Sequence, residues 1–175
     1  MALLEKDLKK TTPRLCKVDR DLLKFLHKCD HRVSVKNERV FVGLAIYING
    51  NLYLVPLTSA TCAKRISEGK KPRPNTIITK VMDGAEEIAD LLYNNMIPVK
   101  EDYITDVIID PAKDSYLANE ERFIRKNWVA INLKAISIYR NRYNALHRDY
   151  DFLTKMCCDF RKLEDVLKKY QPSKN

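Results

Sequence analysis

The chain has little of what nucleotide-cofactor enzymes and membrane proteins need. It holds four glycines among 175 residues, and neither a G-x-G-x-x-G run nor a P-loop sequence occurs, which disfavours an enzyme with a nucleotide cofactor. No apolar run approaches the roughly 18 residues of a membrane-spanning helix. The first ten residues carry charges where a secretion signal is apolar. We therefore expect a cytoplasmic protein without a cofactor.

Cysteine and histidine are also too few, and wrongly spaced, for a disulfide scaffold or a structural zinc site. The five cysteines are an odd number, and two of them, Cys157 and Cys158, are adjacent. His27, Cys29 and His31 lie close together, but a structural zinc ion usually needs two pairs of ligands, and adjacent cysteines cannot readily supply the second pair. We expect reduced thiols and no metal.

Basic residues exceed acidic ones by nine, and the excess is unevenly distributed. Residues 83–121 contain eleven acids and two bases, a net charge of −9, against +18 for the rest of the chain. Such an asymmetry favours a polyanionic partner such as a nucleic acid. Many small basic proteins bind no nucleic acid, so charge alone leaves the question open.

The hydrophobic pattern predicts one globular domain over residues 14–175, preceded by a polar extension over residues 1–13. The strongest local signal is Asn49-Gly50 between two β-rich runs, 40–48 and 51–57, which predicts a hairpin. The other expected strands are 14–18, 76–82, 95–99 and 103–109, and the other expected helices of this part are 19–28 and 85–92.

The last third of the chain has a helical pattern. Apolar residues recur every three or four positions from Leu117 to Ile138, which predicts one long amphipathic helix with Trp128 in the core. A second helix is expected over 160–170. Short strands in a twisted sheet or barrel, braced by helices, make an α+β fold.

Two hydroxyl residues, Thr58 and Ser59, stand where a strand ends and a helix is expected to begin, and Gly69 stands where that helix ends. A helix N-terminus presents unpaired N–H groups and partial positive charge, which suit a phosphate. Thr61 and Lys64 share a face of this helix. The alternative is plain helix capping, which is the commoner role of serine and threonine at such positions.

A basic loop follows this helix. Lys70, Lys71 and Arg73 lie in a proline-containing segment. These residues suit contacts to a phosphate backbone, which are independent of sequence. The alternative is a solvated linker.

Three segments resemble the ToxN/AbiQ toxins, the protein halves of type III toxin–antitoxin systems, which include the CptN branch. They are FVGLAIYINGNLYLVPLTS (41–59), NNMIPV (94–99) and CCDFRKLE (157–164). Weaker similarity extends from Arg14 to Lys169.

The resemblance implies a metal-independent endoribonuclease toxin with a MazF-like (SH3-like) antiparallel β-barrel core, braced by helices that include a long C-terminal one. Such toxins cut A-rich RNA and leave 2′,3′-cyclic phosphate and 5′-hydroxyl ends. A small pseudoknotted RNA antitoxin, which the toxin itself processes, inhibits them in a closed cyclic protein–RNA assembly. Cellular and phage RNAs are the substrates, and the biological role is phage defence by abortive infection.

The resemblance also implies the site residues. The Thr-Ser pair of the family corresponds to Thr58 and Ser59, and its basic residue before the first hairpin strand corresponds to Arg39. The lysine that the family commonly has two positions after the serine is Thr61 here, so we expect Lys64, one helical turn on, to take its place. The catalytic set is thus Thr58, Ser59, Lys64 and Arg39.

RNA is expected to lie in a groove lined by basic residues, with residues 83–121 facing away from it unless their acids pair internally with those bases. The RNA-binding set consists of Arg14, Lys36, Arg39, Thr61, Lys70, Lys71, Arg73 and Lys80. Two alternatives remain open: a non-catalytic RNA- or DNA-binding regulator, and a MazF-like ribonuclease with a protein antitoxin.

Overall fold

The structure, a computed structural model, describes residues 12–35 and 42–172. The hairpin is confirmed: β2 (Val42–Ile48) and β3 (Asn51–Thr58) pair along six residues. The turn between them takes Asn49 at φ 51° and Gly50 at φ 79°, the left-handed conformation that these two residue types tolerate. This hairpin is the centre of the fold.

All strand pairs are antiparallel, in the order β4-β5-β3-β2-β1-β7, with β6 also paired to β3. The strands besides this hairpin are β1 (Leu15–Val18), β4 (Ile78–Asp83), β5 (Glu86–Leu92), β6 (Ile97–Val99) and β7 (Ile104–Asp106). β3 pairs with β6 near its start and with β5 only through its last two residues.

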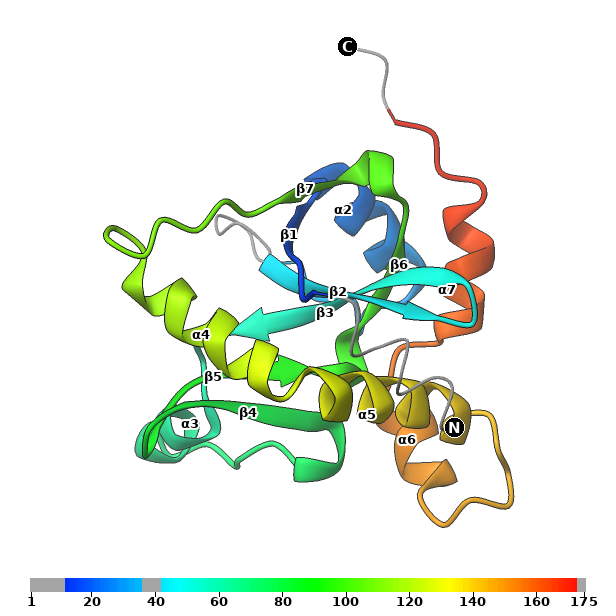
Figure 1. The fold of residues 1–175 in the computed structure, drawn as a ribbon. Coiled ribbons are helices and arrows are strands. Elements are labelled where there is room, and N and C mark those ends of the chain that lie inside the picture. Colours follow the sequence, from blue (N-terminus) through cyan, green and yellow to red (C-terminus); the bar gives the residue numbers. More distant parts are fainter. Residues whose placement is uncertain (1–11, 36–41, 173–175) are drawn as a thin grey trace.

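This change of partner along β3 leaves the sheet open. The ribbon of β4 and β5 diverges from the sheet of β1, β2 and β7, and the two lie on opposite sides of the molecule (Figure 1). Within the described residues the end strands β4 and β7 do not pair. The fold is therefore α+β with an open antiparallel sheet, and the expectation of a closed barrel is not met.

Two helix predictions need correction. Residues 86–92 form β5 rather than a helix, because pairing with β4 and β3 outweighs the helix propensity of its Glu, Ala and Leu residues. The single long helix is two, α4 (Ser115–Lys126) and α5 (Trp128–Asn141), interrupted at Asn127. Asn127 turns its side-chain amide back to the carbonyl oxygen of Phe123, 2.8 Å away. Trp128 is buried, as predicted.

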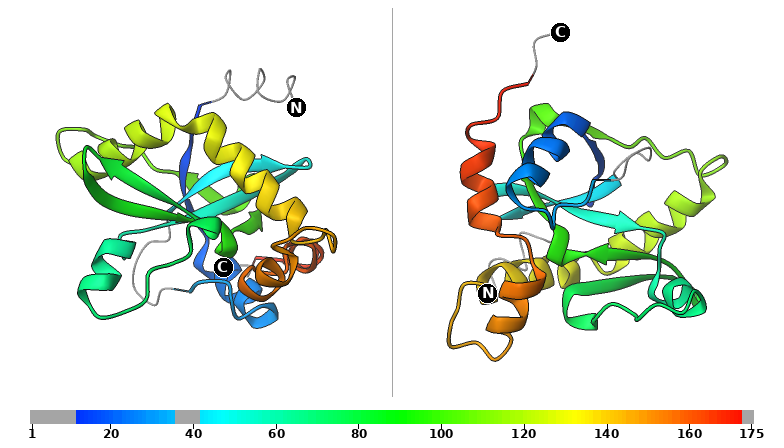
Figure 2. Two further views of the ribbon diagram at one scale, coloured as in Figure 1. Left: turned by 90° about the horizontal axis from the view of Figure 1, so that it is seen from below. Right: turned by 180° about the vertical axis from the view of Figure 1, so that it is seen from behind.

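The helices cover both parts of the sheet (Figure 2). α4 packs on β4 and β5, α5 crosses β2, and α7 (Phe160–Leu167) packs against β6 and α2 (Arg20–Cys29). α6 (Tyr150–Met156), which the sequence analysis missed, precedes α7. No described helix is long and apolar enough to cross a membrane.

Two of the three motif segments meet in one structural junction. The Cys158 amide donates to the carbonyl oxygen of Asn94 (2.9 Å), and the Asp159 amide donates to the Asp30 carboxylate (2.7 Å). Asp30 also pairs with Arg32 (2.9 Å). Burial raises the pKa of the Cys158 thiol, which keeps it protonated and unreactive. These motifs therefore join α2, β6 and α7, and the chemistry must be sought around the third motif.

Candidate functional site

The turn between β3 and α3 (Cys62–Ser67) carries the hydroxyl residues of the third motif. Thr58 is buried at the end of β3, and its Oγ1 accepts from the Ala60 amide at 3.2 Å. Thr61 caps α3 by accepting from the Lys64 amide at 3.1 Å. Ser59 is exposed. Two hydroxyls thus fix the turn, and the third faces solvent.

The first backbone N–H groups of α3 are already occupied. The Cys62 amide donates to Oε1 of Glu87 at 2.6 Å, and the Ala63 amide reaches the same oxygen at 3.4 Å. A carboxylate thus lies where the sequence predicted a substrate phosphate. The side chains of Ser59 and Lys64 are exposed beside this turn. The prediction that the free amides of the helix terminus bind a phosphate needs correction, because Glu87 already bonds them.

Sheet pairing aligns three polar residues across three strands. Asp90 on β5 is the partner of Thr58 on β3 and of Lys80 on β4. Directly paired residues of antiparallel strands point to the same face. Thr58, Asp90 and Lys80 therefore share one face of the sheet, with the buried Asp90 in the middle.

A β-bulge adds Glu87 to this row. Val81 pairs with Ala89, but the next residue, Met82, pairs with Glu87, which leaves Ile88 as the extra residue. The extra residue reverses the alternation of faces, so Glu87 shares a face with Asp90 three positions away. Lys80 pairs with Glu87 at 3.3 Å.

Arg73 connects the turn to this row of side chains, which consists of Thr58, Asp90, Lys80 and Glu87. Its Nη1 donates to the carbonyl oxygen of Ala60 at 2.6 Å and to Oδ2 of Asp90 at 3.1 Å. Its side chain is 20% exposed, and Asp90 is fully buried. Sequence analysis placed Arg73 among the RNA contacts, but the structure places it under the turn.

The two carboxyl groups differ in protonation. Burial, together with the nearby Glu87, raises the pKa of Asp90 to about 6. Burial also acts to raise the pKa of Glu87, but the Cys62 amide and Lys80 outweigh it, so the pKa of Glu87 is lowered. Asp90 therefore keeps its proton to a higher pH than an exposed aspartate does, and Glu87 loses its proton at a lower pH than an exposed glutamate does.

Cys62, Glu87 and Asp90 are also the one group of possible metal ligands found in the described part of the chain, with ligand atoms within 4.8 Å of one another. Lys80 and Arg73 already pair with the two carboxylates. Burial raises the pKa of the Cys62 thiol. The cluster is therefore explained by internal ion pairs without a metal.

The structure does not bring all the predicted RNA-binding residues together. Arg14, beside β1, pairs with Glu101 (3.0 Å) and Asp106 (2.8 Å), so its charge is neutralised at the opposite edge of the sheet from β5. Lys70 pairs with Glu68 at 2.7 Å.

The remaining predicted positions divide into two groups. Lys36 and Arg39 lie outside the described residues. Lys64 and Lys71 are exposed, and neither makes an ion pair among the residues that the structure describes. These two lysines, with Ser59, form the accessible face of the turn and of the loop after α3. Acids of segment 83–121 pair internally with Arg14, Arg73 and Lys80, as the charge argument allowed.

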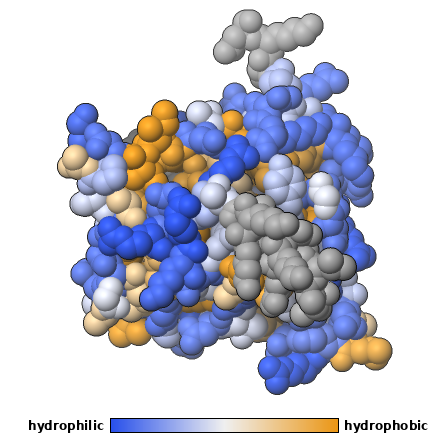
Figure 3. Space-filling view, in the orientation of Figure 1, coloured by the Kyte–Doolittle hydropathy of each residue, from blue (hydrophilic) through white to orange (hydrophobic). Residues whose placement is uncertain are grey.

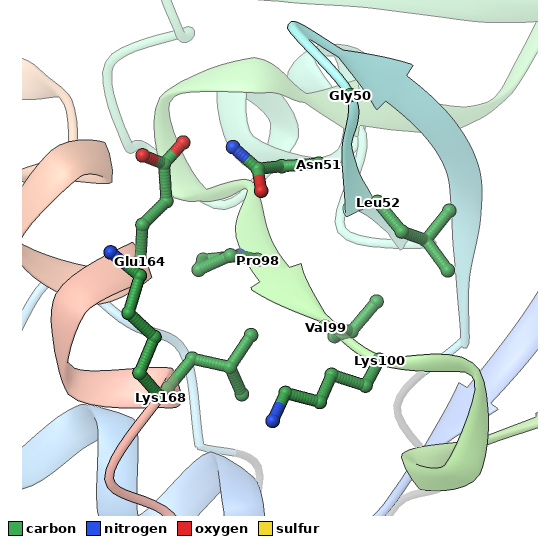
Figure 4. Close-up of a pocket in the computed structure, with 9 residues that line it drawn as sticks. Gly50, Asn51, Leu52, Pro98, Val99, Lys100, Glu164 and Lys168 are labelled. Atoms are coloured by element: carbon green, nitrogen blue, oxygen red, sulfur yellow. The ribbon is translucent and has the colours of Figure 1, made fainter.

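A pocket of about 280 Å³ lies at the far end of β3 (Figure 4). It is lined by Asn51, Pro98, Lys100, Glu164 and Lys168, among others. Asn51 and Thr58 are seven positions apart along the strand, about 23 Å at 3.3 Å per residue. The pocket is therefore separate from the Ser59 turn. The face of the molecule seen in Figure 3 is mainly hydrophilic, with scattered apolar areas.

The chain is similar to known proteins along most of its length. The family model described as toxin ToxN of the type III toxin–antitoxin system matches residues 14–168. Endoribonuclease ToxN of Bacillus thuringiensis subsp. kurstaki is 28% identical over 176 residues, covering 93% of this chain and 86% of that protein.

Solved structures share the fold. A bacterial type III toxin, studied for its selective inhibition by a non-coding RNA pseudoknot, has a TM-score of 0.80 and 25% identity, covering 91% of this chain and 98% of that one. The lactococcal anti-phage endoribonuclease AbiQ has a TM-score of 0.76 and 22% identity, with the same coverage. With nearly the whole chain matched by the family model, this protein belongs to the ToxN family of toxins from type III toxin–antitoxin systems.

Proposed function

We propose that the chain, as a single domain over residues 14–175, is the endoribonuclease toxin of a type III system and cuts RNA at the Ser59 turn. The observation that carries the assignment is an exposed hydroxyl on a turn fixed from below by Thr58, Glu87 and Arg73. The relative from Bacillus thuringiensis supports the activity, since it is named an endoribonuclease.

The reaction uses the 2′-hydroxyl of the substrate as nucleophile. Attack on the adjacent phosphorus gives a 2′,3′-cyclic phosphate and releases the 5′-oxygen, so the protein needs to hold the phosphate in line and to stabilise its growing negative charge. Ser59 donates a hydrogen bond to the phosphate, and Lys64 supplies positive charge. Thr58 acts through the turn, because its hydroxyl is buried and bonded to the Ala60 amide.

Arg39 is proposed as the second cation of the site. It stands three positions before β2, and Gly43 near the start of β2 pairs with Pro56 near the end of β3. The end of β2 that follows Arg39 thus lies beside the end of β3 that carries Thr58, and Arg39 itself lies outside the described residues. One of the two cations, Lys64 or Arg39, protonates the leaving 5′-oxygen, and the proton of the attacking 2′-hydroxyl passes to solvent water.

The proposed partner is a small pseudoknotted RNA antitoxin in a cyclic protein–RNA assembly, in the cytoplasm, with phage defence as the role. The solved type III toxin with pseudoknot inhibition supports this partner. Of the predicted RNA contacts, Lys70, Lys71 and Lys80 have exposed side chains, although Lys70 pairs with Glu68 and Lys80 pairs with Glu87. Arg14 and Arg73 are removed from the set because acids and a backbone carbonyl occupy their guanidinium groups.

The test is cleavage of a long A-rich RNA in EDTA, with the ends of the products mapped. Ser59→Ala is compared with Ser67→Ala, a matched control on the exposed end of α3 whose hydroxyl bonds only the Lys64 carbonyl oxygen. We expect wild type and Ser67→Ala to cut and leave cyclic-phosphate ends. Ser59→Ala should lose cleavage while binding the antitoxin nearly as well.

Three outcomes would contradict the proposal. Loss of antitoxin binding together with activity would make Ser59 a structural or binding residue. RNA that is retarded on a gel but left intact by the wild type would favour a non-catalytic regulator, whose binding falls steeply with salt. Inhibition by a small protein encoded beside the toxin would favour a MazF-like system.

A further inference from the structure

We propose that Arg73 and Asp90 are positioning residues of RNA cleavage: the pair holds the Ser59 turn in its reactive conformation and does not contact RNA. This inference rests on the proposed function, since it assigns a role in that reaction. Neither residue is joined to the turn by a short stretch of sequence, so their role is visible only in the assembled sheet.

The contacts form a chain from the sheet to the turn. Asp90 is fixed in β5 by pairing with β3 and β4 and is fully buried. Its Oδ2 accepts from Arg73, and the same Nη1 donates to the Ala60 carbonyl oxygen. Ala60 directly follows Ser59, so the guanidinium fixes the peptide next to the reactive hydroxyl.

The backbone of the basic loop is held at the same place. The Arg73 amide donates to Sγ of Cys62 at 3.3 Å, and this sulfur lies 3.5 Å from Oδ2 of Asp90. The loop over residues 70–75 is therefore attached to the start of α3 through Arg73. If this loop were a solvated linker, the Ala60 carbonyl oxygen would lack its hydrogen bond from Arg73.

Accessibility separates Arg73 from the neighbouring lysine. The Arg73 side chain is 20% exposed, and its donors already serve two acceptors, whereas Lys71 two residues earlier is exposed. RNA contact is thus assigned to Lys71 and positioning to Arg73. Lysine does not replace arginine here, because its side chain is one bond shorter and its ammonium stops short of the position of Nη1, the atom that donates to both acceptors.

The pair also predicts a pH response. The groups facing Asp90 are Thr58 on β3, Lys80 on β4, Glu87 on its own strand, Cys62 on α3 and Arg73. A proton added to Asp90 weakens its hold on Arg73 and loosens the turn. Cleavage by the wild type should therefore fall as the pH is lowered through about 6, the raised pKa of this carboxyl.

The experiment measures kcat and KM on an A-rich RNA for Arg73→Lys, Asp90→Asn and Lys71→Ala, with pH profiles from 5 to 8. We expect Arg73→Lys to lower kcat at least tenfold with KM within twofold, and Lys71→Ala to raise KM with kcat nearly unchanged. Asp90→Asn should lower kcat at neutral pH and remove the acidic limb of the profile. A raised KM with unchanged kcat for Arg73→Lys would overturn the proposal. Wild-type kinetics for both Arg73→Lys and Asp90→Asn would overturn it as well.

Amide hydrogen exchange of the folded variants separates this inference from the proposed function. If the wild type does not cut RNA, the proposed function fails, but the Ala60 and Lys64 amides can still be followed. Faster exchange of these amides in Arg73→Lys, with the protection of β2 unchanged, would support the positioning role. Unchanged exchange at the turn would refute it whether or not RNA is cut.

Discussion

The substitution Glu120→Gln should make the protein more stable at alkaline pH and leave it unchanged at acid pH. Glu120 lies on the buried side of α4, which packs on β4 and β5, and it is 2% exposed. Its Oε2 has no hydrogen-bond partner among the described residues. Burial without a cation raises the pKa of this carboxyl from 4.5 to about 7.

The sign follows from proton linkage. The folded protein keeps the Glu120 proton to a higher pH than the unfolded chain does, so stability falls as the pH rises from 4.5 to about 7 and is constant above that. Each unit of pKa difference corresponds to about 1.4 kcal/mol, so the loss above pH 7 reaches about 3 kcal/mol. Glutamine has nearly the same volume and carries no charge, and it removes this loss.

The assay is thermal unfolding of both proteins at pH 4.5 and pH 8. A gain of about 3 kcal/mol corresponds to about 6 to 12 °C for a chain of this size, and we expect it at pH 8 only. Glu121→Gln is the control, because Glu121 is partly exposed and pairs with Arg125 at 2.7 Å, and its removal should cost no more than about 0.5 kcal/mol. An equal effect of Glu120→Gln at the two pH values would refute the reasoning.

Three further substitutions test the packing. Gly43→Ala should lower the free energy of unfolding by about 1 to 3 kcal/mol, because the added Cβ would lie 2.6 Å from Cγ of Leu54; unchanged denaturant midpoints would contradict this. Asp30→Ala should cost about 2 to 3 kcal/mol, less than a fully buried pair since Arg32 is 37% exposed, and a smaller loss in urea titration would show that the junction tolerates the change. Lys134→Met should cost about 1 to 3 kcal/mol, since the Lys134 ammonium donates to the carbonyl oxygens of Asn75 and Ile78. A more stable variant in the same titration would show that burial of the charge costs more than these two bonds contribute.

Local signals in the sequence were sufficient for several elements. Asn49-Gly50 gave the hairpin because both residues accept positive φ, and both have it. Asp19, the first residue of the helix expected over 19–28, caps α2, and its side chain accepts from the Asp21 amide at 2.7 Å. Such signals act over a few residues, so no knowledge of the rest of the fold was needed. The family, too, was recognised from three short motifs.

Local sequence patterns could not predict which residues come together at the site. Residues 86–92 contain good helix formers, and only their position between β3 and β4 makes them a strand. Glu87 and Asp90 share a face because of a β-bulge that the sequence pattern does not predict. Segment 86–92 has three acids, Glu86, Glu87 and Asp90, among apolar residues, and this pattern does not distinguish a helix from a strand.

By itself, the sequence determined the hairpin, the hydroxyl-bearing turn, the basic balance and the family, since each depends on neighbouring residues or on composition. Only the tertiary structure decided that the sheet stays open, that Glu87 occupies the first amides of α3, and that Arg73 bonds the Ala60 carbonyl oxygen. The physical reason is that strand pairing and buried ion pairs join residues far apart in the chain. Their energies depend on burial and geometry that exist only after folding.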